Sequence, residues 1–164
     1  MQFESGVVSA IGGVNIHCRR GGVPGKTPIV LSRGITDSSE CWPGVVGLLE
    51  ATFDVVAVDA RGHGQSDRPA VGYSYEKQMS DLLAVINQLE LEGCVLIGHS
   101  MGAQTSAMAA GMAPDVVSRL VLEDPPWRAA MAEGRGGKQY SEIISYFAEM
   151  DEDEIRAFCR MLHP

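Results

Sequence analysis

The chain has 164 residues, about the size of one domain, and its 45% hydrophobic and 21% charged residues are typical of a folded globular protein. Its 13 lysines and arginines against 21 aspartates and glutamates give a net charge of −8, which argues against a nucleic-acid partner. No apolar run is long enough to cross a membrane, and the first residues lack the features of a secretory signal. We therefore expect a cytoplasmic protein without a membrane partner.

The chain opens with a pattern typical of a β-hairpin, in which residues 6–8 and 14–19 flank a Gly12-Gly13 turn. Short apolar runs bounded by glycine, proline or aspartate follow at residues 28–31, 55–58, 94–97 and 120–122. Such runs are typical of strands that are covered on both faces of a sheet.

Segments with helical spacing lie between these runs. Apolar residues recur at three- and four-residue steps from Met79 to Leu89, with Ser74 as the expected N-cap and Gly93 after the end. Residues 42–49 and 103–113 are the other two expected helices. Strands that alternate with helices predict the α/β class, with a mostly parallel, doubly wound sheet and helices on both faces.

The pattern changes after Pro125-Pro126. A glycine-rich break at residues 134–137 is followed by two helical segments, 140–150 and 151–162, with no strand between them. The acidic residues 151–154 lack the signature of a calcium loop and are expected to cap the second of these helices. We therefore divide the chain into a core, residues 1–126, and a helical segment, residues 127–164.

The cysteines do not have the spacing of a metal site. Cys18, Cys41, Cys94 and Cys159 lie far apart, without a CxxC motif or a Cys/His ligand pattern. We expect reduced thiols in place of disulfides or zinc ligands. Neither a metal nor a cofactor is expected.

The strongest chemical signal is Gly98-His99-Ser100-Met101-Gly102, a G-x-S-x-G motif between a predicted strand and a predicted helix. This context places Ser100 on a strained turn that exposes its hydroxyl at a helix N-terminus, where negative charge is favoured. Side chains at Gly98 and Gly102 would collide with the neighbouring elements. Ser100 is thus the candidate nucleophile.

Two further motifs extend this signal. Residues 59–67, after the apolar run 55–58, match the pattern D-x-R-G-x-G-x-S, and residues 31–35, at the end of the apolar run 28–31, have the sequence Leu-Ser-Arg-Gly-Ile. With the nucleophile motif, they show that the chain from about residue 3 to 127 resembles the N-terminal part of an α/β-hydrolase-fold serine hydrolase. The resemblance implies that residues 127–164 begin a helical cap and that the last strands of the fold are lacking.

The resemblance also implies a set of site residues. The backbone N–H groups of Ile35 and Met101 would form an oxyanion hole, and Arg33 stands where the family usually carries histidine. The expected substrate pocket is lined by Arg33, Gly34, His99 and Trp127.

A catalytic histidine and its acid are harder to place. The family order is serine, then acid, then histidine, and Asp124 follows the sixth predicted strand, where some members carry the acid. Asp124 can equally anchor the loop before Pro125. None of the four histidines is a convincing base: His17 lies on the hairpin, His63 in a loop that supports the oxyanion segment, His99 beside the nucleophile and His163 near the last residue.

These observations lead to two hypotheses. In the first, the chain is part of a serine hydrolase that cleaves an ester or related carboxylic substrate, with its base supplied from outside these residues. Lactonase, haloperoxidase and C–C bond hydrolase chemistry remain open alternatives. In the second, it is a non-catalytic binding or assembly subunit on the same scaffold. In either case we expect self-association or a partner chain to cover the edge formed by residues 119–123.

Overall fold

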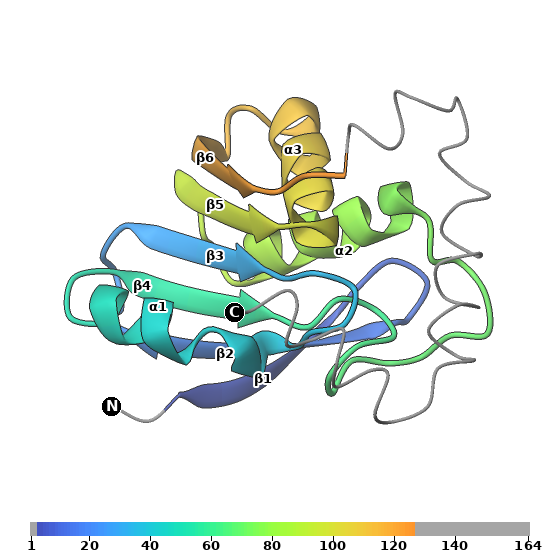
Figure 1. The fold of residues 1–164 in the computed structure, drawn as a ribbon, viewed down its shortest axis with the longest axis horizontal. Helices are drawn as coiled ribbons and strands as arrows, with labels where there is room; N and C mark the ends of the chain where they lie inside the picture. Colours follow the sequence, from blue (N-terminus) through green and yellow to red (C-terminus); the bar gives the residue numbers. More distant parts are fainter. Residues whose placement is uncertain (1–2, 127–164) are drawn as a thin grey trace. The chain divides into compact units, whose positions relative to one another are not determined.

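The computed structural model describes residues 3–126, which form a six-stranded sheet with helices on both faces (Figure 1). The strands are β1 (Glu4–Ser9), β2 (Asn15–Gly22), β3 (Pro28–Ser32), β4 (Asp54–Val58), β5 (Cys94–His99) and β6 (Val117–Glu123), and they lie in the order β1-β2-β4-β3-β5-β6. β2 is antiparallel to β1 and β4, whereas the pairs β3/β4, β3/β5 and β5/β6 are parallel. The predicted hairpin and the mostly parallel α/β sheet are confirmed.

Alternate residues of the central strands enter two separate cores. One core packs under the helices α2 (Tyr75–Gln88) and α3 (Met101–Met112) and includes Val30, Val56 and Leu96. The other includes Ile29, Leu31, Val55 and Ala57 and packs under α1 (Pro43–Leu49) with Trp42, next to the short 3-10 helix η1 (Ser39–Cys41). All five residues of β4 are buried, which is why this strand has no polar alternation.

The helix ends show further detail. Ser74 is the N-cap of α2, as predicted, and the chain takes the left-handed conformation twice between α2 and β5. Glu90, with φ of 55°, lies in that region directly after the C-cap, whereas Gly93 (φ 70°) lies in the turn before β5. α3 begins at Met101, two residues earlier than expected, because the nucleophile turn leads directly from β5 into the helix.

Within the described residues, β6 is the last strand of the sheet and pairs with β5 alone. Its side chains Leu120 and Val121 are 37% and 50% exposed. An edge strand with exposed apolar side chains favours pairing with another chain. Self-association at this edge stays a prediction, and sedimentation at rising protein concentration checks it.

Several expectations concern residues that the structure does not describe. The first of the chain's two units, Met1–Trp127, holds every element given above. The predicted helices at 140–150 and 151–162, the cap assignment for residues 127–164, the pocket residue Trp127, Cys159 and His163 lie outside the described residues. Among residues 3–126, no helix has the length and apolar character needed to span a membrane.

Candidate active site

Ser100 occupies the sharp turn between β5 and α3. Its backbone has φ of 51° and ψ of −115°, a conformation that residues with a side chain rarely adopt. The Ser100 amide donates a 2.9 Å hydrogen bond to the Glu123 carbonyl, which ties the turn to the end of β6. The residue is half-buried, and its hydroxyl makes no hydrogen bond within residues 3–126. The strained, accessible turn predicted from the motif is confirmed.

The two glycines of the motif are required by contact with backbone. A Cβ at Gly98 would lie 2.5 Å from the Gly102 carbonyl oxygen and 2.6 Å from the Ala103 Cα. A Cβ at Gly102 would overlap the Ser32 carbonyl and lie 2.8 Å from the Arg33 nitrogen. These neighbours are main-chain atoms that cannot rotate away, so glycine is needed at both positions.

Two backbone N–H groups remain unpaired on the segments that adjoin Ser100. Met101 is the first residue of α3, and neither its amide nor that of Ile35 donates a hydrogen bond to any described residue. The Ile35 segment is close to the nucleophile, since a Cβ at Gly34 would lie 3.4 Å from the Ser100 Cβ. Free N–H groups at a helix N-terminus are suited to bind a negatively charged oxygen.

Arg33 braces the loop that carries these residues. Its guanidinium carbon lies 4.3 Å from the centroid of the Trp42 ring, and Nη2 donates a 3.0 Å hydrogen bond to the Cys41 carbonyl. The Arg33 Nη1 lies 3.4 Å from Nδ1 of His99 and 3.9 Å from the Asp37 carboxylate. Arg33 thus stacks on Trp42 and contacts several loop residues at once, and a histidine at this position could not make the same set of contacts. Its predicted role in the substrate pocket stays a prediction.

The three histidines of the described part have partners other than Ser100. His99 Nδ1 faces Arg33, and His17 Nδ1 lies 2.8 Å from the Asp59 carboxylate. The two ring nitrogens of His63 face backbone carbonyls, one of which belongs to Ile35. Within residues 3–126, therefore, no histidine is placed to remove the proton of Ser100.

Asp124, the predicted acid, follows β6 and lies beside the nucleophile turn. It comes directly after Glu123, whose carbonyl accepts the Ser100 amide. Asp124 is exposed, has a φ of 45° and bonds to no other described residue. Its backbone position is therefore close to the nucleophile turn, and its carboxylate is available to a further group. Its role as the acid stays a prediction.

The cysteine thiols are poor competitors of Ser100 as nucleophiles. Cys18, Cys41 and Cys94 are free. Burial raises the pKa of the Cys94 thiol to about 11 and also raises the pKa values of Cys18 and Cys41. Because the thiolate is the reactive form, none of these three cysteines is activated for attack.

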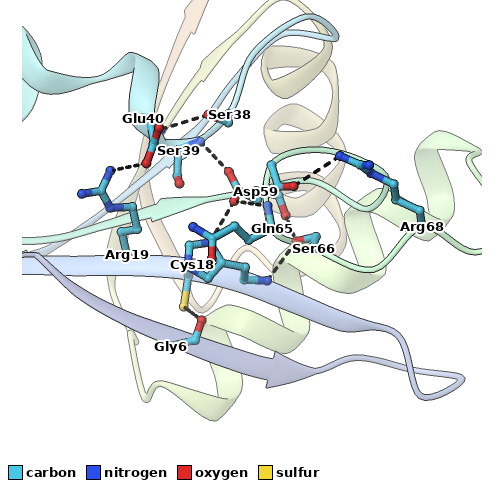
Figure 2. Close-up of polar contacts among 12 residues, drawn as sticks. Gly6, Cys18, Arg19, Ser38, Ser39, Glu40, Asp59, Gln65, Ser66 and Arg68 are labelled. Carbon is cyan, nitrogen blue, oxygen red and sulfur yellow. Dashed lines mark hydrogen bonds and ion pairs between the residues drawn. The ribbon is translucent and has the colours of Figure 1, made fainter.

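A buried carboxylate holds the loops around the site together, as Figure 2 shows. Asp59 accepts hydrogen bonds from the amides of Ser39 at 2.5 Å and Gln65 at 3.0 Å, and it pairs with His17 at 2.8 Å. These three partners come from η1, from the 59–67 loop and from β2. The sequence does not predict the His17–Asp59 pair, since it places His17 only on the hairpin. The one local sign of a role for Asp59 is that this residue begins the D-x-R-G-x-G-x-S motif.

We expect the Asp59 carboxylate to stabilise the fold in a pH-dependent way. Burial raises its pKa, but the hydrogen bonds from Gln65, Ser39 and His17 outweigh burial and lower it overall. The stabilisation is therefore present above the unfolded-state pKa of about 3.9 and is lost as the pH falls through the lower folded-state pKa.

The measurement compares the wild-type chain with Asp59→Asn. Urea unfolding should give a difference of about 1–3 kcal/mol at neutral pH, which shrinks as the pH is lowered from about 6 to about 3. A difference that stays constant over this interval would contradict a structural role for the ionised carboxylate.

Comparison with known proteins finds a family and several relatives that resemble this chain. A family model described as alpha/beta hydrolase fold matches residues 27–157. The chain is 36% identical over 115 residues to 2-(acetamidomethylene)succinate hydrolase of Mesorhizobium japonicum and 33% identical over 166 residues to N-formylmaleamate deformylase of Pseudomonas putida. These alignments cover 70% and 96% of this chain, but 40% and 60% of the two relatives.

A solved structure shows the same arrangement. The N-formylmaleamic acid deformylase of Pseudomonas putida S16 superposes with a TM-score of 0.68 at 36% identity, covering 75% of this chain and 47% of that enzyme. The superposition thus extends over most of this chain and about half of that enzyme.

Proposed function

Because the chain belongs to the alpha/beta hydrolase fold family, we propose that it carries the nucleophile and oxyanion hole of a serine hydrolase. The substrate class is an ester or a related carboxylic compound. The observation that supports this most is the strained backbone of Ser100 with two unpaired N–H groups, those of Ile35 and Met101, on the adjoining segments. The chain spans 40% and 60% of the lengths of two curated relatives, so we assign the base to the remainder of the protein or to another chain.

The proposed reaction begins with attack of the Ser100 Oγ on the substrate carbonyl carbon. The hydroxyl proton passes to a general base, and the carbonyl oxygen becomes an oxyanion that accepts hydrogen bonds from the Ile35 and Met101 amides. Collapse of this intermediate expels the leaving group, which takes the proton, and leaves an acyl group on Ser100. Water then hydrolyses the acyl–serine ester and releases the carboxylic acid product. In this scheme the carboxylate that orients the general base is that of Asp124.

The test is covalent labelling of this chain and of the full-length gene product by a fluorophosphonate probe, together with hydrolysis of p-nitrophenyl acetate by the full-length product. We expect Ser100→Ala to lose labelling and to reduce hydrolysis at least a thousandfold, roughly, because no other activated nucleophile is present in the described part. Ser106→Ala is a matched control in α3. It removes a buried hydroxyl that has no hydrogen-bond partner among the described residues, and it should label like the wild type.

The alternative is a binding or assembly subunit that keeps the scaffold without the chemistry. Absence of labelling both in this chain and in the full-length gene product would favour it. If labelling occurs, the reaction type is decided by substrate. The two relatives are named for hydrolysis of an acetamidomethylene succinate and for deformylation of N-formylmaleamate, so N-acyl compounds belong in the assay beside lactones and simple esters.

A further inference from the structure

We propose that His63 is a positioning residue for the oxyanion hole and that it acts as an imidazolium, with both ring N–H groups donated to backbone carbonyls. This inference rests on the proposed function, because it concerns the placement of Ile35. It assigns a specific chemical state to a loop residue that does not itself contact the reacting atoms.

The evidence is the pair of contacts that the His63 ring makes. Its Nε2 lies 2.6 Å from the Ile35 carbonyl oxygen and its Nδ1 lies 3.0 Å from the Arg61 carbonyl oxygen. A carbonyl oxygen can only accept a hydrogen bond, and a neutral imidazole carries only one N–H. Both contacts are hydrogen bonds only when both nitrogens are protonated. In the neutral ring, one nitrogen lone pair would face a carbonyl lone pair.

The loop that carries His63 is held firmly on the side away from Ile35. The His63 amide donates to the Ala60 carbonyl at 2.9 Å, and the Ser66 amide donates to the His63 carbonyl at 3.0 Å. The Arg61 guanidinium forms two hydrogen bonds, of 2.6 and 2.7 Å, with the buried Asp81 carboxylate. Because the Arg61 carbonyl is fixed in this way, the His63 ring transfers the position of the 59–67 loop to Ile35.

No carboxylate of the described residues lies within 4.0 Å of a His63 ring nitrogen. The charged groups of the two loops that meet at the ring are engaged elsewhere or lie apart from it. Arg33 contacts Asp37, Asp59 pairs with His17, and Arg61 pairs with Asp81. Glu40 contacts Arg19, Asp67 accepts the Asn15 amide, and Arg68 reaches the Gly64 carbonyl. The ring nitrogens thus face two backbone carbonyls and no carboxylate of the described residues.

The bridge bears on the site through Ile35. With both ring N–H groups of His63 donated, the Ile35 carbonyl is held in place, and with it the segment whose amide we assign to the oxyanion hole. Loss of the bridge would leave the Ile35 amide less well placed and Ser100 less reactive.

The first test observes the hydrogen bonds directly. In the protein with ¹⁵N-labelled histidine, NMR at mildly acidic pH should show both ring N–H protons of His63 protected from exchange with water, with couplings across the bonds to the Ile35 and Arg61 carbonyl carbons. Detection of a single protected N–H would overturn the bridge. This readout needs no catalytic activity, so it separates failure of the bridge from failure of the proposed function.

The second test measures the rate of Ser100 labelling by the fluorophosphonate probe in the full-length gene product. His63→Gln should label about tenfold more slowly, the effect of losing about one hydrogen bond. Gln65→Ala, an exposed side chain in the same loop, is the matched control and should keep the wild-type rate. If His63→Gln keeps the wild-type rate, His63 is not a positioning residue. If the full-length wild type is not labelled, the proposed function fails, and the NMR readout alone decides whether the bridge exists.

Discussion

Replacing Gly102 by alanine is expected to lower the free energy of unfolding by about 3 kcal/mol, the upper part of the usual range for overpacked sites, and to abolish labelling of Ser100. The added methyl group would overlap the Ser32 carbonyl and approach the Arg33 nitrogen to 2.8 Å. Both atoms belong to the backbone at the end of β3, so the strain can be relieved only by moving α3 away from the sheet. That movement would displace the Arg33–Ile35 segment and the Met101 amide together.

The same helix contains the control. Gly111 lies near the other end of α3, and a Cβ placed there meets nothing within 4 Å. Gly111→Ala should therefore stabilise the chain by about 0.5–1 kcal/mol, because alanine loses less backbone entropy in a helix than glycine does. Urea unfolding and probe labelling of both variants give the measurement. Equal effects of the two substitutions would show that Gly102 is not a site of steric conflict.

The sheet and the nucleophile turn could be predicted from sequence because their signals are local. Apart from Asp54, the residues of β4 form a continuous apolar run, and the burial of this strand on both faces follows from that pattern. The conformation of Ser100 could be predicted because glycines at positions 98 and 102, within the same five-residue motif, indicate that helix and strand pack closely on both sides of the turn. Each of these features depends on neighbours in the chain, and a single sequence contains that information.

Apart from the supporting role expected of the loop that carries His63, the contacts that support the site could not be predicted, because they join residues that are far apart in the chain. His17 and Asp59 are separated by 42 residues, and Arg33 and His99 by 66. Residue type shows that a buried aspartate needs a partner, but not which of several histidines or amides provides it. The replacement of the family's usual histidine by Arg33 is a further case. Sequence shows a different charge, whereas the structure shows a guanidinium stacked on Trp42.

Removing the positive charge of Arg61 is the second change for which we expect a large effect. Arg61 and Asp81 are each 4% exposed at the side chain and are joined by two hydrogen bonds of 2.6 and 2.7 Å, and Arg61 also donates to the Gly72 carbonyl at 2.7 Å. Arg61→Met would leave the Asp81 carboxylate buried without its partner. We expect a loss of about 3–5 kcal/mol in the free energy of unfolding, measured by urea denaturation.

The double variant Arg61→Met with Asp81→Leu distinguishes the loss of the ion pair from the cost of leaving the Asp81 carboxylate buried and unpaired. Much of the lost stability should return, since no unpaired carboxylate remains, although the Gly72 carbonyl stays without its donor. Arg19→Met is the control, because Arg19 and Glu40 form a 3.4 Å ion pair with 32% and 68% exposed side chains and should contribute about 0–1 kcal/mol. An Arg61→Met variant no less stable than Arg19→Met would contradict the buried pair. If the double variant regains stability but still labels slowly, the Arg61 side chain also acts on the site, because it fixes the backbone whose carbonyl contacts the His63 ring.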